Sequence, residues 1–354
     1  MLDKFLIRED ASIKEAMKKM NNTGSKALFI LNKENKLFGS LTDGDIRRWI
    51  LKNGGLNEKI DKACNKNPIF ITQDYDREKV KKLLLSNKIE RIPVINKERE
   101  VLEVLLLEDI LGHDQLIPKE KLNLPVVIMA GGKGTRLDPF TKILPKPLIP
   151  IGERAIIDII MDKFSIYGVN EFYISINHKA KMIKSYFEEM NTKYLINYVE
   201  ENMPLGTAGC LKFLEDKIND SVMVSNCDII IDCDYSEFGA FHNKNNYDIS
   251  IVGSLRHFTI PYGICEIEDG GALKNIIEKP EYDFLVNTGM YILSKKALNL
   301  IPKNQKTHIT DLIEIVKNSK GKVGVFPINE KAWIDIGQWD EYHKSVKLLK
   351  LSNR

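Results

Sequence analysis

A cluster of cationic side chains follows a glycine-rich turn in the stretch VVIMAGGKGTRLDPFTKILPKPL, residues 126–148. The glycines of this turn are Gly131, Gly132 and Gly134. Because glycine has no side chain, the backbone amides of such a turn can approach a ligand closely. Arg136 carries a fork of donors that matches phosphate oxygens, and Lys142 and Lys146 add positive charge nearby. The stretch therefore predicts a site for an anion with several phosphate groups.

Two familiar phosphate-binding loops do not fit this stretch. A P-loop requires the pattern G-x-x-x-x-G-K-[ST], and the chain has GGKGTR. A dinucleotide fingerprint requires a third glycine, and Leu137 stands in its place. There remains a loop whose amides clamp a nucleotide at the carboxyl end of a first strand, where open α/β sheets bind ligands. Alternatively, the prolines only hold solvated lysines, but the grouping of Arg136 and Lys146 with the glycines favours binding.

The chain around these residues alternates between strand-like and helix-like patterns. After residue 125, apolar runs such as VVIMA, EFYISI and SVMVSNCD are separated by helical runs such as AIIDIIMDKFSIYG and KAKMIKSYFEEM. This alternation predicts an α/β fold with a Rossmann-like, mixed and mainly parallel sheet that has helices on both faces. Near residue 250 the strands become shorter and are joined by turns, which predicts an antiparallel excursion from the main sheet.

The first 117 residues contain an internal repeat. ILNKE at residues 30–34 recurs as VINKE at residues 94–98, 64 positions later. Each copy reads as helix, strand, turn, strand and helix, and Ser12 and Glu15 have the spacing of a capping box. One copy is too small to bury its own sheet face, so the two should pair about a pseudo-twofold axis. The expected parts are a first module at 1–58, a second at 59–117, a linker at 118–124 and a larger domain at 125–354.

The repeat resembles a tandem pair of CBS modules, which form an α/β (Bateman) domain. In that family the hydroxyl and carboxylate of a T-x-x-D element hold a ribose, which here implies Thr42 and Asp45 and a regulatory nucleotide as ligand. Alternatively, these two residues merely cap the next helix. The second copy has Leu106 in place of the hydroxyl, so the resemblance implies one ribose site at most. Because CBS pairs commonly associate with a second pair, a homodimer is also implied.

Composition and charge argue against several classes of protein. The 52 lysines and arginines nearly balance the 49 aspartates and glutamates, which disfavours a nucleic-acid-binding protein. The start MLDKFLIRED is charged, and no long apolar run predicts a signal peptide or a membrane helix. Five cysteines without a C-x-x-C pair are typical of a reduced cytoplasm and make a poor metal site. We therefore expect a cytoplasmic protein that binds neither nucleic acid nor membrane.

The glycine-rich stretch resembles the signature of the sugar-phosphate nucleotidyltransferases, whose catalytic domain is GT-A-like. The resemblance continues in PLGTAG (204–209), VSNCDII (224–230), PYGI (261–264), EKP (278–280), NTGMY (287–291) and WIDIG (333–337). Together with the CBS pair, it makes the chain similar to the glucosamine-1-phosphate guanylyltransferases of bacterial legionaminic acid synthesis. The resemblance implies Mg²⁺-dependent transfer of a nucleoside monophosphate from a nucleoside triphosphate to a sugar 1-phosphate, with release of pyrophosphate.

The same resemblance implies roles for single residues. Arg136 would hold the triphosphate, and Lys146 would contact the α-phosphate and the attacking phosphate. Asp228 and Asp335 would bind Mg²⁺, although an aspartate at the end of a strand is more often a turn former. The implied nucleotide-binding residues are Ala130, Gly131, Gly132, Gly134, Thr135, Arg136, Glu200, Glu201, Pro204, Gly206 and Thr207. The implied sugar-phosphate residues are Gly263, Glu278, Lys279 and Asn287.

Two neighbouring glutamates bear on the choice of base. Glu200 and Glu201 stand where several relatives that use uridine or thymidine nucleotides have a glutamine. A carboxylate accepts both donors of guanine, N1–H and the N2 amino group, but repels the carbonyls of uracil and thymine. This favours GTP unless both glutamates are solvated.

Two other functions stay open at this point. One is a transferase that uses UTP, dTTP or CTP with another hexose or heptose 1-phosphate, since the sequence does not define the sugar hydroxyls. The other is a catalytically silent subunit that senses nucleotide sugars. Such a subunit could lose Lys146, Asp228 and Asp335, whereas all three are present, which favours the enzyme.

Overall fold

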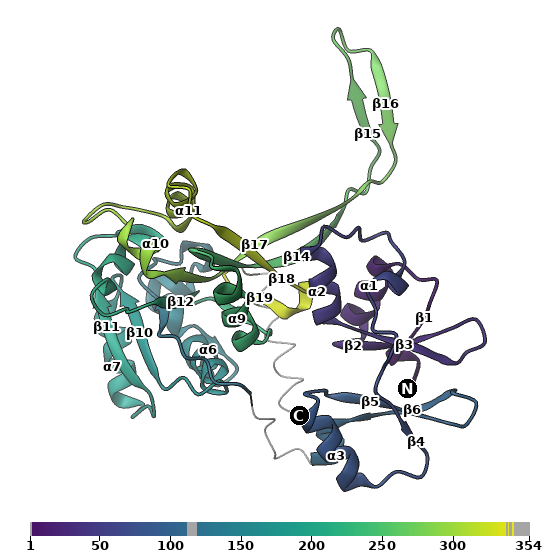
Figure 1. Cartoon of the computed structure of the whole chain (residues 1–354). Coiled ribbons are helices and arrows are strands. Elements are labelled where there is room, and N and C mark those ends of the chain that lie inside the picture. Colours follow the sequence, from purple (N-terminus) through teal and green to yellow (C-terminus); the bar gives the residue numbers. More distant parts are fainter. Residues whose placement is uncertain (1, 112–118, 338, 340–341, 343–354) are drawn as a thin grey trace. The chain divides into compact units, whose positions relative to one another are not determined.

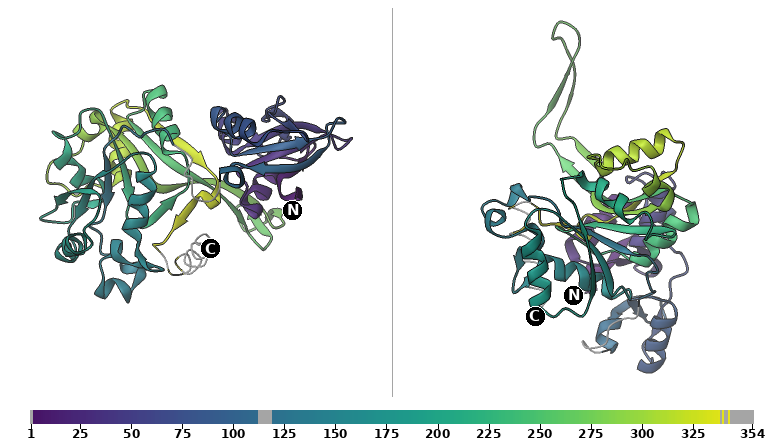
Figure 2. Two further views of the ribbon diagram at one scale, coloured as in Figure 1. Left: turned by 90° about the horizontal axis from the view of Figure 1, so that it is seen from below. Right: turned by 90° about the vertical axis from the view of Figure 1, so that its left-hand side faces the viewer.

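The computed structural model describes residues 2–111, 119–337, 339 and 342. It divides into two compact units, residues 1–118 and 119–354, shown in Figures 1 and 2. Within the described residues, no helix is both long and apolar enough to cross a membrane.

The first unit begins with a small three-stranded module. Its elements are η1 (Leu2–Phe5), β1 (Leu6–Arg8), α1 (Ile13–Thr23), β2 (Ala27–Leu31), β3 (Leu37–Thr42) and α2 (Asp43–Leu51). β2 pairs with β1 in parallel and with β3 in antiparallel orientation. Helix α1 starts with the predicted capping box of Ser12 and Glu15, and it ends at Gly24, whose φ of 67° suits a left-handed cap.

A second module repeats this topology. Its elements are η2 (Ile60–Lys62), β4 (Ile71–Thr72), α3 (Arg77–Ser86), β5 (Arg91–Ile95), β6 (Val101–Leu106) and α4 (Leu107–Leu111). β5 again pairs with one strand in parallel and with the next in antiparallel orientation. The repeat in the sequence therefore corresponds to a structural repeat. The sequence pattern missed the short leading strands β1 and β4, because two or three residues carry too little periodicity.

The two modules pack through a shared apolar cluster. Phe5, Phe29 and Leu37 of the first module belong to one buried cluster with Ile95 of the second. A β-bridge joins Lys36 to Glu100, and these positions are equivalent in the 64-residue repeat. A contact between equivalent positions lies on the axis that relates two copies, so this bridge supports the predicted pseudo-twofold pairing.

A mixed sheet forms the centre of the second unit (Figures 1 and 2). In spatial order its strands are β11 (Leu195–Glu200), β10 (Glu171–Ile176), β7 (Val126–Met129), β12 (Ser221–Asn226), β17 (Glu281–Ser294), β14 (Ile249–Thr259) and β18 (Val323–Ile328). The first four run parallel to one another, and β17 is antiparallel to both of its neighbours. This is the mixed, mainly parallel sheet that the sequence predicts.

Helices cover both faces of this sheet. One apolar cluster contains residues of α6 (Ile156–Ser165), α7 (Ala180–Glu189) and α9 (Tyr235–Asn245). The other contains residues of η5 (Cys210–Leu214), α10 (Lys295–Asn299) and α11 (Ile309–Asn318). Within β7, Val126 and Ile128 join the first cluster and Val127 joins the second, so alternation along a strand assigns each side chain to one face.

Short elements surround the carboxyl ends of the parallel strands. They are η3 (Thr135–Leu137), α5 (Phe140–Ile143), η4 (Lys146–Leu148), β8 (Pro150–Ile151), β9 (Arg154–Ala155), α8 (Gly206–Gly209), β13 (Ile229–Ile231), η6 (Glu330–Ala332) and β19 (Trp333–Asp335). β13 pairs with β19 in antiparallel orientation, which brings a late segment of the chain back to the end of β12.

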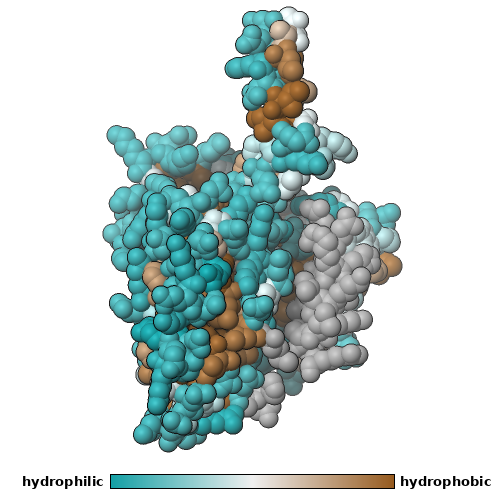
Figure 3. All heavy atoms as spheres, turned by 90° about the vertical axis from the view of Figure 1, so that its right-hand side faces the viewer, coloured by the Kyte–Doolittle hydropathy of each residue, from teal (hydrophilic) through white to brown (hydrophobic). Residues whose placement is uncertain are grey.

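An arm projects from the central sheet. β14 and β17 continue beyond it and are joined by the hairpin β15 (Ile264–Ile267) and β16 (Leu273–Ile277), as Figure 1 shows. This is the predicted antiparallel excursion, but the expected shortening of the strands was wrong, because β14 and β17 are the longest strands among the described residues. Ile267, Leu273 and Ile276 are exposed on the hairpin, which has an apolar side in Figure 3.

Candidate active site

The carboxyl ends of three strands meet at the glycine-rich loop. In register, Met129 at the end of β7 lies beside Ser175 of β10 and beside Asn226 of β12. Ala130 is buried, and its amide donates to the Ser175 carbonyl at 2.9 Å, which fixes where the loop leaves the sheet. The loop therefore starts at the edge where parallel sheets bind ligands.

Two of the loop glycines leave little space for a side chain. Gly134 has a φ of 70°, and a Cβ there would lie 2.9 Å from the Thr141 methyl and 3.1 Å from the Lys146 Cβ. A Cβ on Gly131 would lie 3.1 Å from the Glu201 Oε1 atom. At Gly132 nothing lies within 4 Å, so this position faces open space in which a ligand can approach the backbone.

A cavity of about 400 Å³ opens over this loop. The predicted residues that line it are Gly131, Gly132, Gly134, Thr135, Arg136, Lys146, Glu201, Pro204, Gly206, Thr207 and Asp228. The remaining lining residues are Met129, Ser175, Asn226, Cys227, Lys306 and His308. Among the predicted nucleotide-binding residues, Ala130 lies beneath the loop and Glu200 lies outside the cavity.

Lys146 and Asp228 form an ion pair at the cavity wall, and each side chain is only 13% exposed. Asp335 joins them because β19 pairs with β13: Asp335 lies opposite Ile229, and the Ile336 amide donates to the Asp228 carbonyl at 2.8 Å. The three side chains converge on Gly337. A Cβ there would lie 2.5 Å from the Asp228 Oδ2, 2.9 Å from the Asp335 Oδ1 and 3.3 Å from the Lys146 Nζ.

The surroundings of Asp335 disfavour its negative charge. Burial and the nearby charge of Asp228 raise the pKa of Asp335, while a hydrogen bond from the Gly337 amide and the charges of Lys146 and Arg136 act in the opposite direction. A bound cation would reduce the repulsion between the two carboxylates in this partly buried site. Because its charge lowers the pKa of Asp335, Arg136 lies close enough to interact with the same carboxylates.

The residues at this point fit a magnesium ion that also binds substrate. Mg²⁺ prefers oxygen ligands and is often held by one or two carboxylates together with substrate phosphates. Asp228 and Asp335 provide the carboxylates, and no group of three or more potential ligands occurs among the described residues. Cys227 is not suited to the role, because burial raises the pKa of its thiol to about 12.

Of the two glutamates, Glu201 is the one in the cavity. Its Oε1 accepts from the Ser175 hydroxyl and its Oε2 from the Leu205 amide, both at 2.9 Å. Each oxygen keeps a second lone pair that can accept from a ligand. Glu200 instead pairs with Lys184 at 2.5 Å, and its side chain is 58% exposed.

The loop that carries Lys306 and His308 was not predicted from the sequence. It is docked on the segment 204–209: the Thr307 amide donates to the Leu205 carbonyl at 2.8 Å, and the Ala208 amide donates to the Thr307 carbonyl at 3.0 Å. A Cβ on Gly206 would lie 2.5 Å from the Thr307 carbonyl oxygen. The glycines of PLGTAG signal a close backbone approach, but the sequence does not reveal which segment approaches.

The predicted sugar-phosphate residues are divided between two places. Gly263, Glu278 and Lys279 lie on the arm, where a Cβ on Gly263 would be 2.9 Å from the Glu278 Oε2, and none of them lines the cavity. Asn287 lies nearer, because its Oδ1 accepts from the Gly289 amide at 3.0 Å and Gly289 packs against the cavity residue Asn226. The roles of all four residues remain predictions.

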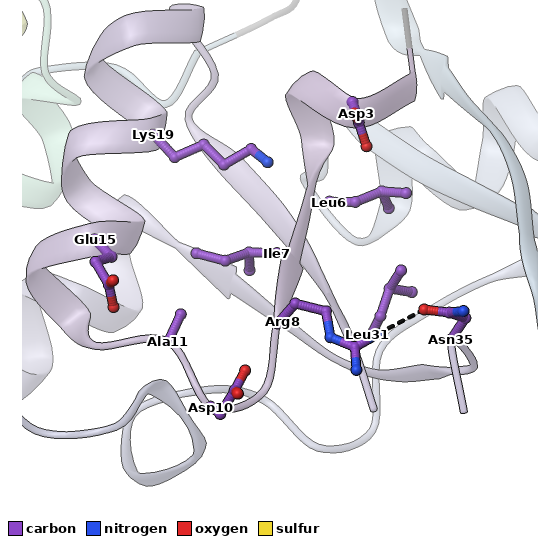
Figure 4. A pocket seen from close by; sticks show the side chains of 10 residues that line it. All are labelled: Asp3, Leu6, Ile7, Arg8, Asp10, Ala11, Glu15, Lys19, Leu31 and Asn35. Carbon is purple, nitrogen blue, oxygen red and sulfur yellow. Dashed lines mark hydrogen bonds between the residues drawn. The ribbon is translucent and has the colours of Figure 1, made fainter. Parts of the chain in front are cut away.

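Thr42 and Asp45 cap helix α2 in a reciprocal capping box, the simpler of the two expectations. The Asp45 carboxylate accepts from the Thr42 amide at 2.8 Å and pairs with Arg48 at 2.5 Å. A cavity of about 600 Å³ in the first unit lies elsewhere, at the other end of the β1–β2–β3 sheet, where Arg8 pairs with Leu31 in register. Figure 4 shows its lining, which includes neither Thr42 nor Asp45.

Comparison with known proteins identifies the families to which the two units are similar. The family model described as nucleotidyl transferase matches residues 125–350, and the CBS domain model matches residues 1–52 and 60–115. The chain belongs to the nucleotidyl transferase family. The members of this family that it resembles include a mannose-1-phosphate guanyltransferase of Yarrowia lipolytica, 31% identical over 222 residues that cover 60% of each chain.

The chain is also similar to a protein named for another nucleotide and to a solved nucleotide complex. A UTP–glucose-1-phosphate uridylyltransferase of Synechocystis is 26% identical over 245 residues, 63% of each chain. The structure of HddC from Yersinia pseudotuberculosis complexed with GMP-PN is 27% identical, has a TM-score of 0.51 and covers 64% of this chain and 99% of that chain. The chain spans about 60% of the length of the curated guanyltransferase from Yarrowia.

Proposed function

We propose that this chain transfers a nucleoside monophosphate, GMP from GTP, to a sugar 1-phosphate and releases pyrophosphate. The observation that carries this proposal is the meeting of Arg136, Lys146 and Asp228 at one cavity wall with the glycine-rich loop. An anion-binding loop, two cations and two carboxylates are the parts that a reaction between two phosphate-bearing substrates requires.

The proposed reaction needs positioning and charge neutralisation more than covalent participation of the protein. A phosphate oxygen of the sugar 1-phosphate attacks the α-phosphorus of GTP, and the bond from that phosphorus to the bridging oxygen of the β-phosphate breaks. Mg²⁺ held by Asp228 and Asp335 would neutralise phosphate charge. Arg136 holds the triphosphate, and its charge stabilises the departing pyrophosphate.

Lys146 has a second task in this proposal. In the free chain its ammonium group is paired with Asp228. Asp228 would hold Mg²⁺ together with Asp335, which would leave the Lys146 ammonium group for the α-phosphate and the attacking oxygen. The ion pair therefore keeps a partly buried lysine in place until substrate arrives, which limits the reorganisation needed for the reaction.

The choice of GTP rests on Glu201. Its carboxylate borders the cavity and can accept from N1–H and the N2 amino group of guanine. The guanyltransferase relatives and the GMP-PN complex of HddC support the same base. The uridylyltransferase relative from Synechocystis keeps UTP as the alternative donor.

Two sugar substrates are candidates. The combination with a CBS pair, by resemblance, favours glucosamine 1-phosphate and a role in legionaminic acid synthesis. The curated relatives favour mannose 1-phosphate. Pyrophosphate release should be measured with GTP and with glucosamine, mannose, glucose and heptose 1-phosphates in turn. The glucosamine assignment predicts the highest kcat/KM for glucosamine 1-phosphate, and a higher value for mannose 1-phosphate would replace it.

The CBS pair is proposed to bind a regulatory purine nucleotide at Thr42 and Asp45 and to contribute to a homodimer. Because the cap of α2 occupies both side chains, a ribose would have to share or replace these hydrogen bonds. Calorimetry on residues 1–120 with AMP, ATP, GMP and GTP tests the ligand. Binding that is lost in Asp45→Ala, while the fragment stays folded, would support the site. If no nucleotide binds at millimolar concentration, assembly is the better role for this unit.

A further inference from the structure

Lys306 is a cation that lines the cavity, and the proposed reaction does not use it. It lines the cavity but is exposed, and within the described residues its ammonium group has no salt-bridge partner. Lys146, the other cavity lysine, is committed to Asp228. Lys306 is therefore available to a ligand from the start.

A relay of hydrogen bonds connects Lys306 to the carboxylate of Glu201. The Leu205 amide donates to Glu201 at 2.9 Å, and the Leu205 carbonyl accepts from the amide of Thr307, the residue after Lys306, at 2.8 Å. Glu201 and Lys306 are therefore carried by two segments that are hydrogen-bonded to each other through Leu205. Both residues line the same cavity as Arg136 and the glycines of the loop.

Further contacts hold the loop of Lys306 against the segment 205–209. The Ile309 amide donates to the Thr207 hydroxyl at 2.9 Å, and Thr307 itself is only 4% exposed. A Cβ on Gly209 would lie 2.8 Å from the Gln305 carbonyl oxygen, so the two segments are in close contact before Thr307 as well as after it. Lys306 is thus attached to a rigid support and not to a free surface loop.

We propose that Lys306 donates a hydrogen bond to O6 of guanine, while Glu201 accepts from its N1–H and N2 donors. This inference rests on the proposed function, because it takes the base of GTP to lie on the segment 204–207. Guanine presents O6 and N7 as acceptors, and lysine is a common partner for them. Adenine has an amino donor at the position of O6 and an acceptor at N1, so a lysine and a carboxylate placed in this way repel it.

The test is nucleotide binding to the full chain, measured by calorimetry in Mg²⁺ without a sugar 1-phosphate. In Lys306→Met, GTP should bind about 10-fold more weakly or worse, whereas ATP should lose less than about threefold. Lys306→Arg keeps a donor and should retain the preference for GTP. Lys303→Met is the matched control, because Lys303 is an exposed lysine of the same loop that does not line the cavity, and it should bind as the natural chain does.

Other outcomes overturn the inference. Equal weakening of GTP, ATP and free pyrophosphate in Lys306→Met would place the ammonium group on the phosphates instead of the base. No change for any nucleotide, or a natural chain that does not prefer GTP to ATP, would remove base recognition from Lys306. If the natural chain binds GTP with this preference but transfers nothing to any sugar 1-phosphate, the proposed function fails and the base recognition stands.

Discussion

Lys146 and Asp228 pair at the carboxyl end of the central strands, although 82 residues separate them in the chain. Both side chains are largely shielded from water, so their interaction is stronger than that of a surface ion pair. Asp335 approaches the same point through the pairing of β13 with β19. Asp335 adds a second carboxylate to this point, and the charges of Lys146 and Arg136 act on it.

Removal of either partner of this pair should abolish most of the activity. Lys146→Ala and Asp228→Asn should each lower kcat by about 10²-fold or more, because each removes charge stabilisation that is concentrated in the transition state. Steady-state pyrophosphate release measures the effect, with circular dichroism to establish folding. Lys142→Ala is the matched control, because Lys142 is exposed in the same segment and does not line the cavity. Near-normal kcat in Lys146→Ala would remove this lysine from the reaction.

Substitution of Glu201 should weaken nucleotide binding, whereas substitution of its sequence neighbour Glu200 should not. Glu201→Gln should weaken GTP binding by about 1–3 kcal/mol, the value of a charge-assisted hydrogen bond, and should weaken UTP less. Glu200→Gln serves as the control and should change neither nucleotide, since Glu200 pairs with Lys184 outside the cavity. Calorimetry with both nucleotides gives the comparison. Equal losses for GTP and UTP in Glu201→Gln would mean that this carboxylate supports the loop and does not read the base.

Asp335 should make stability depend on pH and on Mg²⁺. Because the pKa of Asp335 is raised in the folded chain, its contribution to stability is present at low pH and is lost as the pH rises through the folded-state pKa. At neutral pH without metal, Asp335→Asn should therefore raise the Tm of the second unit, by about 2 °C or more.

Added Mg²⁺ should reverse this order. It should raise the Tm of the natural chain, whose carboxylates bind it, more than that of Asp335→Asn. Differential scanning calorimetry at pH 7, with EDTA and then with Mg²⁺, checks both statements. A lower Tm for the variant in EDTA would show that the Asp335 charge is already compensated in the free protein.

Replacement of two cavity glycines by alanine should have different effects, on stability at one position and on GTP binding at the other. Gly206 has a φ of 82° and meets the Thr307 carbonyl, so Gly206→Ala should cost about 2 kcal/mol or more of stability. Gly132 faces open space, so Gly132→Ala should fold normally but bind GTP about 10-fold more weakly, because a methyl group separates the loop from phosphate. Urea denaturation and GTP titration of both variants test the contrast. Unchanged GTP affinity in Gly132→Ala would show that the loop does not approach the phosphates closely.

Sequence patterns predicted the parts of the molecule that depend on local periodicity. The mixed sheet, the two repeated modules and the capping box at Ser12 follow from alternation, repeat spacing and helix-cap chemistry. The glycine-rich loop and its cations were recognisable because they are contiguous in the chain. The choice between Glu200 and Glu201 was not, because it depends on which side of β11 and its following loop faces the cavity.

Contacts between distant segments were beyond the reach of these patterns. Lys306 and His308 reach the cavity because their loop is held on PLGTAG by backbone hydrogen bonds. Such bonds require no particular side chains, so the sequence does not reveal them. Gly263, Glu278 and Lys279 were grouped with the cavity by motif, whereas in this structure they lie on the arm. A motif specifies residue order, but the twist and length of β14 and β17 decide where such residues lie.

The most direct test of the proposed reaction follows the α-phosphate of GTP. The chain should be incubated with Mg²⁺, a sugar 1-phosphate and GTP that carries a radioactive α-phosphate, and the products should be separated by ion-exchange chromatography. The account predicts that the label appears in a GDP-sugar, in equal amount to the pyrophosphate released, and that Asp228→Asn forms both products about 100-fold more slowly or worse. Label that stays in GTP with every sugar 1-phosphate, or that appears only in free GMP or GDP, would contradict it.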